Sequence, residues 1–224
     1  MVMTMMIRPL SRRHVIAGAA GFAALALLRS PAQAAPPRAA RLSPQDEAEL
    51  VRVQAYLNDI RTLQSRFQQF SGEGGTASGT IYLQRPGRMR IVYDDPSPIL
   101  IIADGREVYY WDKKLQELSQ INVDETPAWF LLRPEIKLTG DVTVTSFDRA
   151  PGALRIAMTQ TKNPDQGSLT LVVSQRPLEL RQWTVIDAQQ RPITVALDNP
   201  HFGAQLDPNL FIWTDQRSTS GRGK

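Results

Sequence analysis

The sequence predicts a mainly β fold with an α lid: a single, strongly curved antiparallel sheet forming an incomplete, half-open β-barrel capped by short helices. Three observations support this prediction. Apolar residues recur at every second position in about eleven segments between residues 62 and 198. One segment of helical periodicity precedes them, and one short, almost wholly apolar helix interrupts them. So many strands facing one way cannot stay flat and open, so we expect the sheet to curl around the helical pieces.

Residues 1–34 are typical of an export signal and are set apart from the fold. Arg8, Arg12 and Arg13 make a basic start, a 14-residue apolar run (15–28) follows, and the small residues of 32–34 suit a cleavage site. The run is shorter than the ~18 residues of a membrane-spanning helix. The arginine pair resembles a twin-arginine signal, and the general export route stays open. We therefore expect a protein of the periplasm.

The composition of the remaining chain excludes several classes of function. The whole sequence has 26 basic and 22 acidic residues, but four of the basic residues belong to the signal, which leaves 22 of each. Equal numbers of basic and acidic residues give no excess of positive charge with which to bind nucleic acid. There is no cysteine, and the only histidine after the signal, His201, falls in a predicted loop. We therefore expect no enzyme, no cofactor, no metal site and no nucleic-acid partner, and we expect a monomer.

The elements follow one another in a simple order. Residues 35–42 read as a linker, 43–214 as the folded domain and 215–224 as a disordered tail. Ser43 and Pro44 are typical of a helix start, so a helix is expected near 44–59. A short helix over 128–133 follows Thr126 and is stopped by Pro134, and a capping segment covers 206–213. Strands are expected near 62–70, 77–85, 88–94, 98–103, 106–112, 115–121, 141–148, 153–160, 168–174, 178–187 and 192–198. The apolar phase slips between Leu180 and Trp183, which predicts a bulge.

Arg85 is the most informative residue of the chain. It closes an apolar row with Ile81 and Leu83, and a guanidinium group cannot lose its charge. We expect it to act as a lid latch that donates hydrogen bonds to the unpaired carbonyl groups at helix ends. The alternative is an exposed arginine in a turn. Arg88 and Arg90 point the other way, and we expect both to be solvated.

The apolar rows predict a hollow, hydrophobic cavity beneath a movable lid. The lid residues are Trp129, Phe130, Leu131 and Leu132. The expected cavity residues are Phe67, Ile81, Leu83, Met89, Ile91, Leu100, Ile102, Trp111, Leu154, Ile156, Leu169 and Leu171. A packed core presents the same residue types as an acyl-chain pocket, so periodicity does not separate the two. Nor does it decide whether Tyr109 and Trp111 or Val108 and Tyr110 face inward.

Several motifs occur together in a fairly specific order. They are Phe67-Gln68-Gln69, Leu83 to Arg88, Ile101 to Gly105, Tyr110-Trp111-Asp112, Thr126-Pro127, Leu180 to Thr184, Phe202-Gly203 and Asp207 to Phe211. In this order they resemble the periplasmic outer-membrane lipoprotein carrier family, LolA, over nearly the whole mature chain. The resemblance implies an unclosed barrel with a helical lid, whose lid-locking arginine falls on Arg85. The cavity-mouth aromatic of the family falls on Met89, where this chain departs from the pattern.

The resemblance also implies a function and partners. Such a carrier shields the acyl chains of lipoproteins between the inner and the outer membrane. It receives them from an inner-membrane lipoprotein-releasing ABC transporter and delivers them to an outer-membrane receptor or membrane. The alternative is a periplasmic carrier or binder of another lipid or apolar ligand on the same scaffold. The family's C-terminal extension is shortened here to residues 215–224.

Overall fold

The computed structural model describes residues 37–126 and 129–215, and in these residues eleven strands form one antiparallel sheet, as predicted. The expected export signal, the helix start at Pro127 and Ala128, and the tail beyond Asp215 lie outside the described residues. The helices are α1 (Pro44–Asp59), η1 (Val123–Glu125), α2 (Trp129–Leu132), η2 (Pro164–Gln166) and η3 (Pro208–Phe211). The strands are β1 (Thr62–Ser71), β2 (Thr76–Gln84), β3 (Arg88–Tyr93), β4 (Ile99–Asp104), β5 (Glu107–Asp112), β6 (Glu117–Asn122), β7 (Val142–Ala150), β8 (Ala153–Gln160), β9 (Gly167–Gln175), β10 (Leu178–Asp187) and β11 (Pro192–Phe202).

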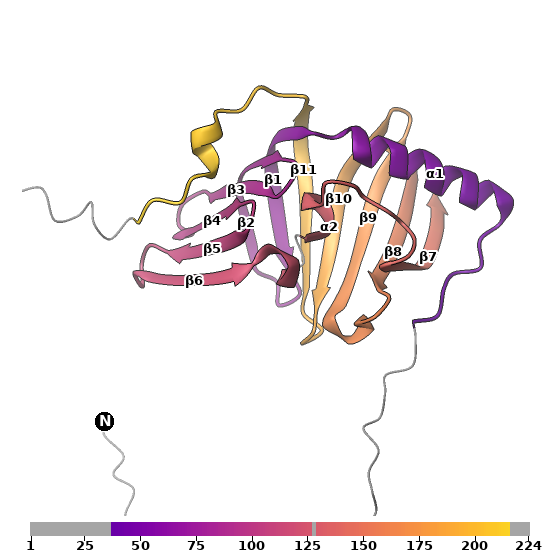
Figure 1. Ribbon diagram of the computed structural model, residues 1–224, viewed down its shortest axis with the longest axis horizontal. Coiled ribbons are helices and arrows are strands. Elements are labelled where there is room, and N and C mark those ends of the chain that lie inside the picture. Colours follow the sequence, from indigo (N-terminus) through magenta and orange to yellow (C-terminus); the bar gives the residue numbers. More distant parts are fainter. Residues whose placement is uncertain (1–36, 127–128, 216–224) are drawn as a thin grey trace, which may run out of the picture. The chain divides into compact units, whose positions relative to one another are not determined.

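The sheet consists of two meanders that meet at its centre. Its strand order is β6-β5-β4-β3-β2-β1-β11-β10-β9-β8-β7, so β1 pairs with β11, and β6 and β7 are the two edges. The edges do not pair, which leaves the barrel incomplete. In Figure 1, β4 to β6 run roughly horizontally and β8 to β10 run roughly vertically. This change in strand direction shows how strongly the sheet twists. The predicted fold class is therefore confirmed.

Most strands lie within two residues of the expected bounds, and β11 is the exception. It continues to Phe202, because its later residues pair with the beginning of β1, where His201 lies opposite Gln64. His201 is therefore an exposed strand residue and not the loop residue that we expected. The predicted bulge in β10 is confirmed by a register shift between Leu180 and Gln182.

Helix α1 begins and ends for local reasons and is fixed to the sheet by its apolar side. Ser43 caps its first turn in a capping box with Asp46. Leu50, Val53 and Leu57 are the residues that it buries. The hydroxyl of its Tyr56 accepts a hydrogen bond of 2.9 Å from the Leu180 N–H at the bulge of β10. Helix α1 is thereby held against one face of the sheet, which we call the inner face; the opposite face is the outer face.

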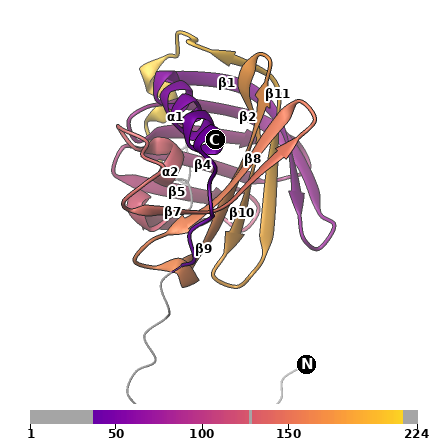
Figure 2. The same cartoon turned by 90° about the vertical axis from the view of Figure 1, so that its right-hand side faces the viewer.

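The connection between β6 and β7 crosses the open side of the sheet. These two strands are the opposite edges, so residues 123–141 must pass from one edge to the other. This connection contains η1 and α2 and then a stretch without regular structure. Figure 2 shows α1 and α2 on the same side of the curved sheet. We call residues 129–132, which form α2, the lid and residues 133–138 the strap. No helix in the described ranges is long and apolar enough to cross a bilayer.

Candidate functional site

Arg85 stands where β2 ends and the chain turns towards β3. Its backbone N–H donates to the Arg61 carbonyl oxygen at 2.8 Å, which ties this turn to the beginning of β1. Two residues later, the Gly87 N–H donates to the Leu132 carbonyl oxygen of the lid, also at 2.8 Å. A side chain at position 87 would meet the Gly105 backbone at 2.7 Å, and Gly87 has a φ of +77°, so glycine is required there. The turn therefore holds the lid both by its backbone and by the Arg85 side chain.

The guanidinium group of Arg85 makes five hydrogen bonds with its five donors. Towards α1, Nη1 donates to the carbonyl oxygens of Leu57 (2.6 Å) and Ile60 (3.1 Å). Towards the strap, Nε donates to the Arg133 carbonyl oxygen (2.8 Å), and Nη2 donates to that of Pro134 (3.3 Å). The fifth bond joins Nη2 to Asn58 Oδ1 at 3.3 Å. Arg85 is thus the common partner of the end of α1 and the beginning of the strap.

The charge of Arg85 is buried without an acidic partner. The residue is 6 % exposed, and none of its contacts in the described ranges is with a carboxylate. Burial lowers the pKa of its guanidinium group, and the nearby charge of Arg61 lowers it further. Main-chain carbonyl groups therefore take the place of a counter-ion, and those at the end of α1 add the negative end of a helix dipole.

Two amide side chains of α1 hold the strap in place, and neither was expected from the sequence. Asn58 forms hydrogen bonds with both backbone groups of Ile136. Its Nδ2 donates to the carbonyl oxygen (2.9 Å), and its Oδ1 accepts from the N–H (2.8 Å). Gln54 Oε1 accepts from the Leu138 N–H at 2.8 Å. Polar residues on a helix are usually exposed, so only the position of Asn58 near the helix end could have pointed to this role.

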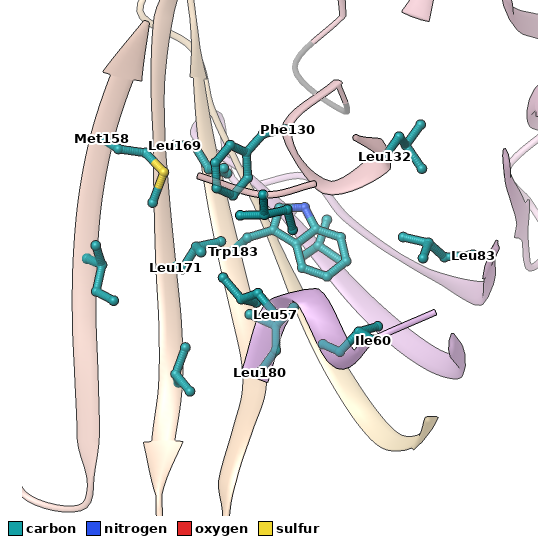
Figure 3. Close-up of a cluster of buried hydrophobic side chains, with 14 of the residues drawn as sticks. Leu57, Ile60, Leu83, Phe130, Leu132, Met158, Leu169, Leu171, Leu180 and Trp183 are labelled. Atoms are coloured by element: carbon teal, nitrogen blue, oxygen red, sulfur yellow. The ribbon is translucent and has the colours of Figure 1, made fainter. Parts of the chain in front are cut away.

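The lid inserts its apolar side chains into the interior. Phe130 and Leu132 are 2 % and 1 % exposed, whereas Trp129 and Leu131 are only partly buried. The Arg133 guanidinium group lies over the Trp129 ring, 4.7 Å from its centre, and Arg133 also pairs with Asp141. Figure 3 shows one cluster that contains Phe130 and Leu132 of α2, Leu57 of α1 with Ile60 directly after it, and Leu171 and Trp183 of the sheet.

The expected hollow beneath the lid is almost completely filled in this structure. The cavity enclosed between α1, the lid and the sheet measures about 20 Å³, which is room for about one water molecule. Leu57, Leu131 and Trp183 are among its lining residues. The prediction of a hollow interior is therefore wrong for this state, because the lid residues themselves occupy the space.

Most of the expected cavity residues lie on the inner face. They belong to the main cluster together with α1 and the lid: Phe67, Ile81, Leu83, Met89, Ile91, Leu154, Ile156, Leu169 and Leu171. Met89 is 8 % exposed and pairs with Leu83 across β2 and β3. Of these residues, Leu169 also lines an open groove beside α2.

Leu100, Ile102 and Trp111 were wrongly placed in the cavity, because they form a separate cluster on the outer face. Register decides this: Ile91 of β3 pairs with Ile101 of β4, so Leu100 and Ile102 point the other way. Strand β5 follows the same rule. Tyr109 and Trp111 face outward, while Val108 and Tyr110 face inward.

The segment after β11 covers this outer cluster. The Trp213 ring stacks on Tyr109 with 5.3 Å between ring centres and meets Trp111 edge-on at 6.1 Å. Arg90 Nη1 donates to the Leu210 carbonyl oxygen at 3.0 Å, and burial lowers the pKa of this guanidinium group. Arg90 is therefore not the solvated charge that we expected, whereas Arg88 is exposed.

Two open grooves flank α2. One, of about 1090 Å³, is lined by Trp129 and Leu132 of the lid and by several cations, among them Arg88, Arg106 and Lys162. The other, of about 760 Å³, reaches the buried side chains of Phe130 and Met158. Within the described ranges, no three His, Asp or Glu side chains are grouped so that they could hold a metal ion. The chemistry available here is shielding of apolar groups and hydrogen bonding by Arg85.

Comparison with known proteins gives one consistent family. The family model described as outer membrane lipoprotein carrier protein LolA matches residues 58–214. The outer-membrane lipoprotein carrier protein of Legionella pneumophila (strain Corby) is 31% identical over 144 residues, which cover 60% of this chain and 69% of that protein. The protein of the same name from Methylococcus capsulatus is 28% identical over 169 residues, 71% of this chain and 80% of that protein.

Solved structures with a similar arrangement share little sequence with this chain. A LolA superfamily protein from Nitrosomonas europaea has 8% identity and a TM-score of 0.43, over 73% of this chain and 97% of that chain. An uncharacterized conserved protein from Thermus thermophilus has 10% identity and a TM-score of 0.47, over 77% and 96%.

Proposed function

The chain belongs to the LolA family of outer-membrane lipoprotein carrier proteins, and we propose that it is a periplasmic carrier that shields the acyl chains of lipoproteins and shuttles them from the inner to the outer membrane. Its relatives from Legionella and Methylococcus are named lipoprotein carriers. A shield is physically required, because each CH₂ group that stays in water costs about 0.8 kcal/mol. The lid and the inner face supply the apolar surface for it.

The observation that carries this proposal is the fully bonded guanidinium group of Arg85. It binds the end of α1 and the strap at once, over an interior that the lid residues fill. A protein that only needed a stable core could place an apolar side chain at this position and avoid burying a charge. Hydrogen bonds from Arg85 to α1 and the strap are directional, and they hold the lid over the apolar inner face. Such bonds suit a lid that opens and recloses.

The same arrangement supports a mechanism for release. Arg85 stabilises the closed, empty state, and incoming acyl chains displace the lid against the free energy of those hydrogen bonds. The loaded state then has its lid bonds broken, and reclosure favours the departure of the cargo. An inner-membrane transporter would supply the cargo, and an outer-membrane receptor or membrane would accept it.

Co-purification of a lipoprotein with the carrier tests this function. The full chain and a triacylated lipoprotein are produced together, and the cargo that remains bound to the purified carrier is measured. A matched cargo whose lipidated cysteine is replaced by serine lacks the acyl chains. We expect the carrier to retain the acylated cargo and not the serine form. Equal retention of both forms, or of neither, would contradict the proposal.

Mass spectrometry of the purified carrier separates this function from the alternative on the same scaffold. A triacyl-peptide mass supports the lipoprotein carrier. Free phospholipid or another apolar compound, found without any acylated cargo, would identify a carrier of a different ligand. The protein must be isolated without detergent, because detergent would occupy the same apolar surface.

A further inference from the structure

The small cavity beneath the lid has a single charged residue among those that line it. Its walls are apolar side chains: Leu57, Ile60, Leu63, Leu83, Leu131, Ile136, Leu180 and Trp183. Arg85 completes the lining. Ligand sites typically combine apolar walls with a few polar groups that fix the orientation of the ligand. A ligand that enlarges this cavity therefore meets one charged group, the guanidinium of Arg85, while the indole N–H of Trp183 can offer a single neutral donor.

The hydrogen-bond acceptors of Arg85 belong to two parts of the chain that differ in freedom. Leu57, Asn58 and Ile60 form the end of α1, from which Arg61 leads directly into β1. The hydrogen bond from the Arg85 N–H to the Arg61 carbonyl oxygen fixes this end relative to Arg85 itself. Arg133 and Pro134 belong to the strap, which is held to α1 by side-chain hydrogen bonds and by the buried side chains of Ile136 and Leu138. When the strap moves with the opening lid, the acceptors on the strap are removed and those on α1 remain.

The donors that lose their acceptors are Arg85 Nε and one N–H of Nη2. They remain in apolar surroundings, where a donor without an acceptor is unfavourable. The methylene part of an acyl chain offers no acceptor, but the ester or amide carbonyl at its head does. We propose that Arg85 Nε and Nη2 donate to the carbonyl oxygens of the ester or amide groups of a bound acylated ligand. Arg85 thereby selects lipids whose chains begin with a carbonyl group.

This inference rests on the proposed function, because it requires that acyl chains replace the lid. It goes further by giving Arg85 a role in the loaded state. Arg85 then exchanges strap carbonyl groups for ligand carbonyl groups and never stays unsatisfied. The exchange also places the head of the ligand beside the end of α1, with its chains along the inner face.

The test compares an ester with its ether analogue. Dioctanoylglycerol has ester carbonyl groups, and dioctylglycerol has ether oxygens in their place and a similar chain length. Each is titrated into the full chain below its aggregation concentration, and the tryptophan fluorescence is followed, since Trp183 lines the cavity. We expect the wild type to bind the ester about tenfold more tightly than the ether.

Variants show whether Arg85 causes this preference. Arg85→Leu should reduce the ester-to-ether ratio at least about fivefold relative to the wild type, and Arg85→Lys should retain part of the preference. Arg155→Leu, which removes an exposed arginine of β8, serves as the control and should keep the full ratio. The ratio is measured within one protein, so partial unfolding of a variant weakens both affinities alike. Its comparison between proteins also cancels the difference in hydrophobicity between the two lipids.

The outcomes separate this inference from the function on which it rests. Equal ratios in the wild type and Arg85→Leu would overturn the carbonyl contact and leave the carrier function intact. Binding of neither lipid to the wild type would overturn both. A reduced ratio in Arg85→Leu, together with an unchanged ratio in Arg155→Leu, would support the role of Arg85.

Discussion

Both faces of the sheet are covered by a chain segment, and an arginine donates hydrogen bonds to each cover. On the inner face, Arg85 is almost fully buried and bonds main-chain carbonyl groups of α1 and the strap. On the outer face, Arg90 is only half-buried and makes one such bond, to Leu210. Burial lowers the pKa of both guanidinium groups. The two covers therefore use the same chemistry to different extents.

The difference bears on the proposal that the inner cover opens. The outer cover depends mainly on the stacking of Trp213 over Tyr109 and Trp111, which tolerates small displacements. The inner cover depends on several directional hydrogen bonds that share one guanidinium group. Displacement of the strap breaks the bonds to Arg133 and Pro134 together and leaves those at the end of α1. This contrast agrees with the proposal that the inner cover opens and the outer cover stays in place.

The replacement Arg85→Leu tests this contrast most strongly. It removes the bonds of the closed state, so acyl chains should still load, while reclosure no longer drives them out. We expect the rate of transfer from the loaded carrier to outer-membrane vesicles to fall about tenfold or more, given about 1–3 kcal/mol for each lost lid bond. Arg155→Leu is the control. Transfer at the wild-type rate would show that Arg85 is not a latch.

The replacement Trp213→Ala tests the permanent cover. Loss of the stacking and of the buried ring area should lower the free energy of unfolding by about 2–3 kcal/mol, as measured by urea denaturation. Cargo transfer should not change, because Trp213 lies on the face away from the lid. A defect in transfer as large as that of Arg85→Leu would break the distinction between the two covers.

The replacement Asn58→Ala sharpens the description of the lid. It removes both bonds to Ile136, so the closed state should lose about 2 kcal/mol relative to the open state. We expect faster loading of an apolar fluorophore in stopped-flow mixing. Asp59→Ala, the exposed neighbour at the end of α1, is the matched control and should load at the wild-type rate. Unchanged loading in Asn58→Ala would mean that the strap does not limit opening.

The smallest expected effect concerns an exposed ion pair near the outer face. Hydrogen bonds from Arg66 and then from Ser78 hold the pKa of Asp94 at about 2 instead of 3.8. Because the unfolded chain takes up this proton first, the contribution is complete above about pH 4 and is lost as the pH falls towards 2. Urea unfolding at low salt should show a slightly steeper acid loss for the wild type than for Asp94→Asn. Parallel curves would show that the pair contributes nothing.

The sequence predicted the fold well because period-two patterns and turn residues are local signals. It also predicted where Arg85 would point, because an arginine that ends an apolar row must find acceptors. It failed for Leu100, Ile102 and Trp111, since β4 and β5 are apolar on both faces and alternation alone does not label the faces. The register between β3 and β4 determines which side of β4 faces inward, and this register is seen only in the structure.

The sequence also did not predict that the interior is filled, or which side chains form hydrogen bonds with the strap. Phe130 and Leu132 would look the same in a filled core and above an empty chamber. Asn58 and Gln54 bind backbone groups of residues about 80 positions away, so no local pattern marks them. Long-range pairing of this kind depends on how the β6–β7 connection crosses the sheet.

The central pairing of β1 with β11 has a consequence for how the chain folds. Each meander consists of hairpins between neighbours in sequence, which form quickly. The seam between them joins residues as distant as Phe67 and Leu197, so it closes a very long loop at a high entropic cost. We expect the hairpins of each half to form first and the pairing of β1 with β11 to form last. Until β1 and β11 pair, the apolar face of each half is exposed to water. If this pairing is slow, the newly made chain is prone to aggregation.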